Sequence, residues 1–166
     1  MSKLPNYHGC FVCGDHNPSG LNVRFHTEDE HVWTTYTPDA QHTGYKGITH
    51  GGIIAALLDE TMGWAPTLTN RRFCVTAELT IQYLKPAKEG VELRVAGWVT
   101  ADRRRIWETA GEITDSEGNL IARATGKYFP LSVEQTDNVV EYLSFDEGCV
   151  PPERVTLSRD KDGPAK

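Results

Sequence analysis

The stretch from Gly51 to Ala65 limits the folds open to this chain more than any other segment. Its apolar side chains lie nearly all the way around a helix axis; they are Ile53, Ile54, Ala55, Ala56, Leu57, Leu58, Met62 and Trp64. A helix that is apolar on every side is buried inside a protein rather than laid along its surface. The sequence therefore predicts one central helix, from about Gly51 to Ala65, with other elements packed around it.

Strand-like segments stand on both sides of this helix. Before it, Leu21–Phe25 alternates apolar and polar residues, His31–Tyr36 is rich in β-branched and aromatic residues, and the polar residues 27–30 form a turn between them. Four more such runs follow the helix, at Phe73–Leu84, Val91–Thr100, Arg105–Thr114 and Asn119–Phe129. Their links are short, whereas a parallel pair needs a crossover of about a dozen residues or more. We therefore predict an α+β fold, in which one antiparallel sheet, in the order ββαββββ, wraps around the helix.

The remaining segments divide the chain into three parts. Its 166 residues are the length of one domain. Residues 1–20 are rich in Pro, Gly, Asn and His and form an irregular lead-in, residues 21–130 form the body, and residues 131–166 are a polar C-terminal extension. Within this extension, Ser132–Leu143 predicts a short amphipathic helix, and the charged composition of about the last ten residues predicts disorder.

Composition and charge exclude several classes of protein. The chain has 17 basic and 23 acidic residues, whereas nucleic-acid binding needs a clustered cationic face. The longest wholly apolar run, Ile53–Leu58, is far shorter than the roughly 20 residues that span a bilayer. The N-terminus lacks the apolar segment of a secretory signal, and four cysteines are too few for a disulfide framework. We expect a cytoplasmic protein that binds neither nucleic acid nor membrane.

Residues suited to chemistry stand at the start of the predicted helix and two turns into it. His50, Gly51 and Gly52 stand at the start, where a helix exposes unpaired backbone N–H groups and the positive end of its dipole. Two glycines let a ligand approach the backbone, so Gly51 N–H can donate to a developing oxyanion and Gly52 can contact substrate. Asp59 is a carboxylate on a largely apolar helix, an environment typical of a general base or nucleophile.

Together these residues resemble the signature of an enzyme family. The segment HGGIIAALLDETMG, in which Asp59 follows His50 by nine positions, is similar to that of hotdog-fold acyl-CoA thioesterases of the phenylacetate-pathway (PaaI-like) group. The segment TAELTIQYLKPA, from Thr76 to Ala87, is similar to the strand that follows the helix in that family. The resemblance extends over roughly residues 10–130. It implies a hotdog fold, hydrolysis of acyl-CoA and a site shared between two subunits.

The resemblance also implies a role for each residue. Asp59 would activate water, or attack the thioester directly to form an anhydride, and the sequence does not separate these routes. Gly51 N–H would stabilise the oxyanion, His50 would orient that turn, and Thr76 would position the water. Some members of the family carry Asn or Gln six residues before the histidine, but this chain has Gly44 there. Which group orients the thioester therefore stays open.

The spacing of Gly51 and Asp59 favours a dimer. Eight residues of helix rise about 12 Å, so one helix cannot bring both groups to the same carbonyl. Two antiparallel helices related by a two-fold axis can pair Gly51 of one subunit with Asp59 of the other. Glu60 lies about 100° around the helix from Asp59, so we do not expect both carboxylates in one small site. We expect a homodimer or a dimer of dimers.

The sequence thus predicts an acyl-CoA thioesterase that releases free acid and CoA and requires no cofactor. Two alternatives stay open, and the acyl group is not predicted. A hydratase or dehydratase of the same fold acts on acyl thioesters, and a non-catalytic sensor would bind acyl-CoA without turnover. The arginines of Arg71–Arg72 and Arg103–Arg105 are candidates to hold the phosphates of CoA, although such runs are more often solvated turns.

The lead-in carries a C-x-x-C-G motif at Cys10–Gly14, with His8 and His16 on either side. Two thiolates on such a turn can bind one Zn²⁺, and the two histidines would complete a tetrahedral structural site. Against this, all the ligands come from one short segment, and no second C-x-x-C is present. A similar segment, followed by N-P-x-G-L, is found in related thioesterases and need not carry metal there. A zinc site formed by His8, Cys10, Cys13 and His16 and a pair of free thiols therefore both stay open.

Overall fold

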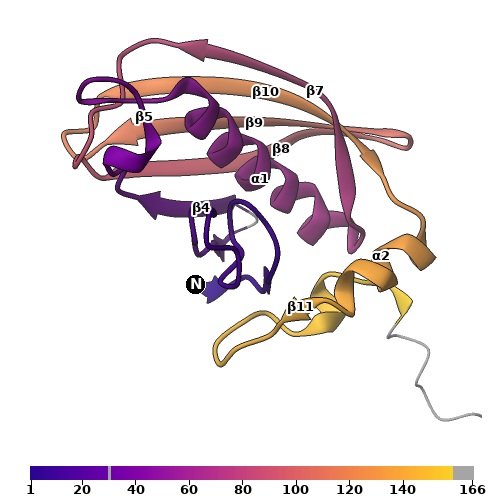
Figure 1. The fold of residues 1–166 in the computed structure, drawn as a ribbon. Coiled ribbons are helices and arrows are strands. Elements are labelled where there is room, and N and C mark those ends of the chain that lie inside the picture. Colours follow the sequence, from indigo (N-terminus) through magenta and orange to yellow (C-terminus); the bar gives the residue numbers. More distant parts are fainter. Residues whose placement is uncertain (30, 159–166) are drawn as a thin grey trace, which may run out of the picture.

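The computed structural model describes residues 1–29 and 31–158 and shows a sheet curved around one long helix (Figure 1). Helix α1 (Gly51–Asn70) lies against the concave face of the antiparallel sheet. Helix α2 (Val133–Val140) and the segment after it lie near the C-terminal end of α1. This arrangement confirms the predicted α+β class and the central helix.

Seven strands form the main sheet, and each pair of neighbours is antiparallel. In spatial order they are β1 (Ser2–Lys3), β3 (His26–Glu28), β4 (His31–Tyr36), β8 (Leu93–Arg103), β9 (Ile106–Asp115), β10 (Leu120–Pro130) and β7 (Cys74–Tyr83). Two small sheets pair β2 (Asn6–Tyr7) with β11 (Leu143–Ser144) and β5 (Thr43–Tyr45) with β6 (Ile48–Thr49). Single turns of 3-10 helix lie at Ala40–His42 and Pro152–Arg154. Along the chain, β4, α1 and β7 to β10 follow the predicted order. In contrast, β3 lies partly where a turn is predicted, and the pattern predicts none of the short strands β1, β2, β5, β6 and β11.

Strand β7 forms one edge of the main sheet. It pairs with β10 rather than with β8, the next strand along the chain, and in the described sheet its other side has no partner strand. Most of its side chains are exposed, including Val75 and Tyr83, which expose 51% and 55% of their surface. A long edge strand leaves a row of backbone N–H and C=O groups available for pairing. Helix α1 therefore has an open sheet edge beside it.

The predicted strand at Leu21–Phe25 is wrong. Leu21, Val23 and Phe25 are buried in alternation, as the pattern indicates, but the ladder of β3 begins only after Phe25. The reason is a different partner. Leu21 N–H donates to the carbonyl of Phe11 at 2.8 Å, and Val23 N–H donates to that of Val12 at 2.8 Å. The N-terminal segment therefore takes the hydrogen bonds that a sheet neighbour would otherwise make.

Helix α1 also continues beyond the predicted end at Ala65. A proline inside a helix removes one backbone hydrogen bond and costs about 3 kcal/mol. In the structure Pro66 is buried, and the hydroxyl of Thr67 donates to the Gly63 carbonyl at 2.9 Å. Packing of this last part of α1 outweighs the proline. The helix ends at Arg71, whose φ of 53° is left-handed.

Three glycines on neighbouring strands allow α1 to approach the sheet closely at Met62. They are Gly97 on β8, Gly111 on β9 and Gly126 on β10. A Cβ atom on Gly97 would lie 3.1 Å from the Met62 backbone, and one on Gly111 would lie 2.8 Å from the Met62 sulfur. Any larger residue there would push the helix outward. The glycines therefore fix the height of α1 above the sheet within one turn of Asp59.

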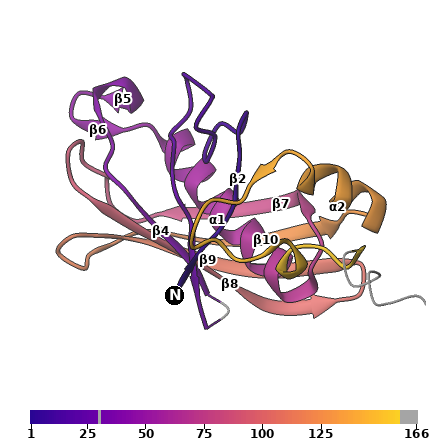
Figure 2. The same ribbon diagram turned by 90° about the horizontal axis from the view of Figure 1, so that it is seen from below.

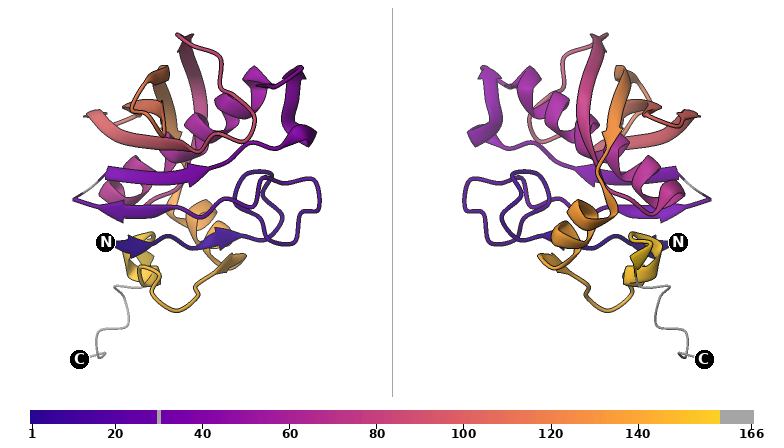
Figure 3. Two further views of the ribbon diagram at one scale, coloured as in Figure 1. Left: turned by 90° about the vertical axis from the view of Figure 1, so that its left-hand side faces the viewer. Right: turned by 90° about the vertical axis from the view of Figure 1, so that its right-hand side faces the viewer.

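The two ends of the described chain lie side by side (Figure 3). Lys3 N–H donates to the Gly148 carbonyl at 3.1 Å, and Val150 N–H donates to the Lys3 carbonyl at 2.9 Å. Strands β2 and β11 pair in the same region. Seen from below, these end segments lie across the side of α1 that the sheet leaves open (Figure 2). They therefore supply a second wall around the helix.

The short helix predicted after residue 131 is confirmed as α2. It begins with a capping box, in which the Ser132 hydroxyl accepts from Gln135 N–H and the Gln135 side chain accepts from Ser132 N–H. The predicted disorder at the end of the chain falls largely on residues 159–166, which lie outside the described residues. None of the helices in the described ranges is long and apolar enough to cross a membrane.

Candidate active site

Asp59 lies two turns into α1 and faces the edge strand β7. The hydroxyl of Thr76, near the start of β7, donates to Asp59 Oδ1 at 2.7 Å. Asp59 is half-buried and Thr76 is exposed, so solvent reaches the pair from the sheet edge. The structure thus brings together two of the residues that the family resemblance singles out. The hydrogen bond occupies one carboxylate oxygen and leaves Oδ2 for another partner.

Tyr128 on β10 also contacts Asp59. Its hydroxyl lies 3.1 Å from the Asp59 carbonyl oxygen and 3.3 Å from Oδ1, and it donates to this pair of acceptors. Burial raises the pKa of Tyr128 above its ordinary value, so the phenol stays a hydrogen-bond donor at neutral pH. Sequence analysis misses this residue. The alternation of Ala124, Gly126 and Tyr128 along the strand, which puts all three on the face toward α1, is the signal that could have found it.

The imidazole of His50 caps the N-terminus of α1. His50 has an extended backbone, and its Nδ1 accepts a hydrogen bond from Gly52 N–H at 2.9 Å. A Cβ atom on Gly52 would lie 2.9 Å from this nitrogen, so the cap needs glycine at that position. The Tyr83 hydroxyl donates to the Gly51 carbonyl at 2.9 Å. As the first residue of α1, Gly51 has no intrahelical acceptor for its own N–H.

Gly51 and Asp59 line different cavities of the single chain. Gly51, Gly44 and His50 line a cavity of about 620 Å³, whereas Asp59 and Thr76 line one of about 480 Å³. This separation agrees with the distance expected from their spacing along the helix. A Cβ atom at Gly44 would lie 3.0 Å from His50 Cα, so a larger residue there would require a small shift of the backbone at His50.

Glu60 points to the lead-in segment rather than to Thr76. Its Oε2 accepts a hydrogen bond from the Cys10 thiol at 3.0 Å. Burial raises the pKa of Glu60 to about 8, and the hydrogen bond from the Cys13 thiol lowers the pKa of Cys10 to about 5. Glu60 and Asp59 line the same cavity, but their carboxylates have different partners, Cys10 for Glu60 and Thr76 for Asp59. Cys10 and Cys13 form part of the cavity wall, and Cys10 contacts the helix through Glu60.

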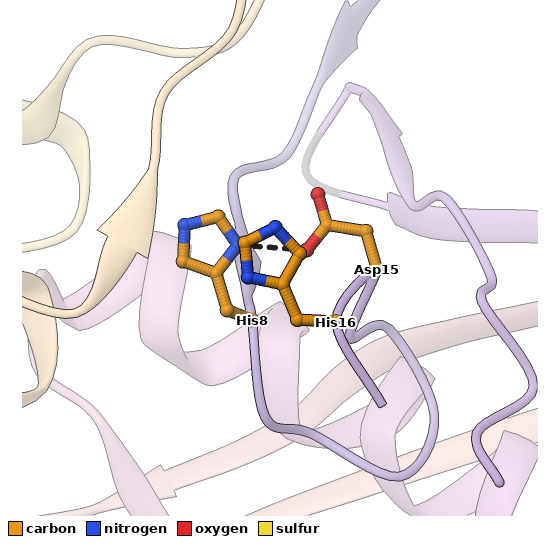
Figure 4. Close-up of side chains that lie close together, drawn as sticks. All are labelled: His8, Asp15 and His16. Carbon is orange, nitrogen blue, oxygen red and sulfur yellow. Dashed lines mark hydrogen bonds and ion pairs between the residues drawn. The ribbon is translucent and has the colours of Figure 1, made fainter. Parts of the chain in front are cut away.

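The four predicted zinc ligands do not form one group in the described chain. Cys10 and Cys13 gather with Glu60, whereas His8 and His16 gather with Asp15 (Figure 4). His8 Nδ1 lies 2.7 Å from Asp15 Oδ1, and its Nε2 lies 2.7 Å from the Ser144 hydroxyl. The His16 ring stacks on that of His8 with centroids 4.2 Å apart. Both nitrogens of His8 are therefore engaged with partners other than the thiols.

Three of the five arginines considered for CoA phosphates have protein partners. Arg71 donates to the carbonyls of Glu153 and Thr156 at 2.7 and 3.1 Å, so it holds the C-terminal segment to the end of α1. Arg72 donates to the carbonyl of Leu131 at 2.9 Å.

In the second run, Arg103 pairs with Glu108 across the β8–β9 hairpin at 2.8 Å. These contacts favour the structural interpretation for Arg71, Arg72 and Arg103.

Comparison with known proteins gives matches to thioesterases and putative esterases. Residues 46–122 match the model of the thioesterase superfamily. The mouse protein named acyl-coenzyme A thioesterase 13 is 30% identical over 87 residues, which are 51% of this chain and 62% of the mouse protein. The chain spans 55 to 62% of the length of the curated relatives that it matches.

Solved structures agree with this family and cover more of the chain. A protein of Streptococcus pneumoniae TIGR4, described as a hypothetical thioesterase and solved with coenzyme A, is 27% identical, with a TM-score of 0.62 over 67% of this chain and 87% of that one. It has also been solved as an aspartate-to-alanine and a threonine-to-alanine variant. The Escherichia coli PaaI protein shares the fold, with 21% identity and a TM-score of 0.63 over 68% of this chain and 81% of PaaI. Residues 46–122 therefore match the thioesterase superfamily, the family that the HGG segment and Asp59 resemble, and the chain has the hotdog fold of these solved structures.

Proposed function

We propose that the protein hydrolyses acyl-CoA to a free acid and CoA, with Asp59 as the reacting carboxylate. One observation carries the proposal. Asp59 Oδ1 is held by hydroxyl groups from two different strands, at 2.7 Å from Thr76 and 3.3 Å from Tyr128. The carboxylate is therefore fixed in orientation at a cavity, as a general base or nucleophile requires. The thioesterase relatives support the choice of substrate class.

Two routes are compatible with this arrangement. In the first, Asp59 takes a proton from water, the hydroxide attacks the thioester carbonyl, and CoA leaves as the thiol after receiving the proton. In the second, an Asp59 oxygen attacks the carbonyl, CoA leaves, and water hydrolyses the resulting anhydride. In both routes an oxyanion forms on the carbonyl and needs a donor at about 3 Å. The N–H of Gly51, at the start of a helix, is the donor we propose.

A dimer would bring this donor to the carboxylate. Gly51 and Asp59 of one chain line separate cavities, so the proposed site combines Gly51 of one subunit with Asp59 of another. The unpaired edge of β7 supports this assembly, because it exposes both hydrogen-bonding groups and the apolar side chains of Val75 and Tyr83 next to α1. Two-fold pairing through such an edge yields two equivalent sites.

The cavity beside Asp59 suits an acyl group. Its volume is about 480 Å³, and much of its lining is apolar, with Trp64 and Phe73 on one side and Val139 and Leu143 from the C-terminal segment. Ligand pockets typically combine such a lining with a few polar groups that fix orientation. The proposed site therefore presents the carboxylate at the edge of a largely apolar pocket.

The test is release of free thiol from a panel of acetyl-, hexanoyl-, palmitoyl-, phenylacetyl- and benzoyl-CoA. Wild type is compared with Asp59→Ala and Asp59→Asn, and with Asp102→Ala as a matched change at an exposed position. We expect turnover of at least one substrate, a loss of about a hundredfold or more in both Asp59 variants, and none in Asp102→Ala. Circular dichroism and size-exclusion profiles check that the variants fold and assemble as wild type does.

Each contrary result indicates a different alternative. Tight binding of acyl-CoA without thiol release would replace the proposal with a sensor. Addition of water across an enoyl-CoA, without thiol release, would replace it with a hydratase. Turnover that survives Asp59→Ala would keep the activity but remove Asp59 from it.

A further inference from the structure

Two thiols and a carboxylate meet where the lead-in segment crosses α1. One donor atom from each of Cys10, Cys13 and Glu60 lies within 4.8 Å of the other two. Cys10 and Glu60 are fifty positions apart along the chain, and their side chains are joined by a hydrogen bond of 3.0 Å. A metal ion of borderline softness such as Zn²⁺ binds both thiolate and carboxylate ligands. The fold alone brings these three groups together, since the C-x-x-C spacing supplies only two of them.

The backbone around the two cysteines supports ligating sulfur atoms. Val12 N–H donates to Cys10 Sγ at 3.2 Å, and Tyr7 N–H donates to Cys13 Sγ at 3.5 Å. The turn closes tightly at Gly14, where a Cβ atom would lie only 2.4 Å from the carbonyl oxygens of His8 and Cys10. Only glycine fits at that position. The turn is therefore fixed in the form that directs both sulfur atoms toward Glu60.

The Glu60 carboxyl lacks a cationic side chain. Among residues 1–29 and 31–158, no Lys or Arg side chain forms an ion pair with it. A carboxylate removed from water is costly unless it is paired or coordinates a metal. A divalent ion between Glu60 and the two sulfurs would supply the positive charge that stabilises the carboxylate form of Glu60.

We propose that Cys10, Cys13 and Glu60 bind one divalent metal ion of the zinc class. Binding releases to solvent the protons that the three ligands still carry, so that two thiolates and one carboxylate coordinate the ion. Three protein ligands leave one position of a tetrahedral ion for water. All three ligands line the cavity of Asp59, so this position faces the cavity rather than a closed protein interior. The metal joins the N-terminal segment to the central helix and completes the part of the cavity wall that Cys10, Cys13 and Glu60 form.

A disulfide between Cys10 and Cys13 is the competing state of the same residues. It would use two of the three groups and would leave Glu60 without its hydrogen bond from Cys10. The contact of Cys10 with Glu60, a third potential ligand, therefore favours the metal-bound state over the disulfide. The inference does not depend on hydrolysis of acyl-CoA, because its measurements concern metal content and spectra.

The experiment uses the full chain, purified under reducing conditions without chelator and analysed for metals by mass spectrometry. The same chain, stripped and titrated with Co²⁺, is examined for the absorption that thiolate-bound Co²⁺ shows in the near ultraviolet. The variants are Cys10→Ser, Cys13→Ser and Glu60→Gln. Cys149→Ser is the matched thiol control, and His8→Ala tests the alternative ligand. Circular dichroism checks that each variant is folded.

We expect about one zinc ion per chain, consistent with a single mononuclear site. Both cysteine variants should lose the ion and the Co²⁺ band. Glu60→Gln should bind more weakly with an altered band, and the Cys149 and His8 variants should match wild type. The proposal is overturned if the folded, reduced chain takes up no Zn²⁺ or Co²⁺, or if uptake persists in both cysteine variants or requires His8. A Cys10–Cys13 disulfide in wild-type protein that binds no metal after reduction overturns it equally.

Discussion

A hydrogen bond of 2.7 Å between the Thr76 hydroxyl and Asp59 Oδ1 ties the edge strand β7 to the central helix. It is one of two hydroxyl contacts that orient the carboxylate, and the other comes from Tyr128. A third contact would restrain the carboxylate further but would leave less room for water. The two contacts therefore fix the orientation of the Asp59 carboxylate and leave its Oδ2 free to contact water or substrate.

Thr76→Val should lower kcat for thiol release by about tenfold to a hundredfold, because a hydrogen bond to a charged group contributes about 1.5–3 kcal/mol. Thr76→Ser keeps the hydroxyl and should stay close to wild type. The measurement is kcat and KM for the best substrate of the acyl-CoA panel. Equal losses in the valine and serine variants would contradict a role for the hydroxyl.

Gly51→Pro should lower kcat by about a hundredfold or more, because proline has no N–H to donate to the oxyanion. Proline is well tolerated as the first residue of a helix, and it requires an extended residue before it. His50, with φ −61° and ψ 134°, already meets this requirement. Gly51→Ala is the control, since its Cβ would be 3.5 Å from the Tyr83 ring, an ordinary contact, and its N–H remains. Full activity in a folded Gly51→Pro protein would exclude this donor.

Mixing the Asp59→Ala and Gly51→Pro proteins should restore activity if the site is shared between subunits. After random exchange, about half of the dimers contain one chain of each kind, and each of these has one intact site, which gives about a quarter of wild-type activity. Exchange is achieved by co-expression with two different affinity tags, followed by isolation of the doubly tagged dimer. Failure of that isolated dimer to turn over substrate would place both groups in one subunit or exclude one of them.

Tyr128→Phe should change the stability of the protein at alkaline pH. The pKa of Tyr128 is raised in the folded state by burial, so between the unfolded pKa of about 10 and the folded value the unfolded chain loses a proton that the folded chain keeps. The contribution of Tyr128 to stability is thus complete below about pH 10 and declines as pH rises further. Phenylalanine removes this decline.

The measurement is urea unfolding of wild type and Tyr128→Phe at several pH values from 9 upward. The difference in unfolding free energy should shift in favour of the variant as pH rises. A difference that stays constant with pH would contradict a raised pKa at Tyr128.

Much of the fold could be predicted from the sequence because its signals are local. The apolar residues of α1 and the alternation in β8 to β10 are read within one element at a time. The errors occur where contacts between distant segments decide. The end of α1 beyond Pro66 depends on the packing of its last part, and Leu21 does not join the sheet because it pairs with Phe11.

The candidate site shows the same division. His50 caps the helix that includes Gly51 and Asp59, so the relative positions of these residues follow from their spacing in the sequence. Tyr128 contacts Asp59 and Cys10 contacts Glu60 across 69 and 50 positions of the chain. The spacing of residues in the sequence does not predict such contacts. Proximity in the sequence suggests His8 and His16 as partners of the two cysteines. The fold instead brings Glu60 to the cysteines.

In the proposed enzyme, the end segments that lie across α1 allow acyl-group selectivity and catalysis to depend on different parts of the chain. The hydroxyl groups that orient Asp59 come from the sheet, whereas part of the wall that an acyl chain would contact, including Tyr7 and Leu143, comes from the two ends of the chain. Residues at those ends can therefore be exchanged to suit a longer, shorter or aromatic acyl group while the reacting carboxylate keeps its support. Selectivity in this architecture can diverge at the termini without change to the catalytic scaffold.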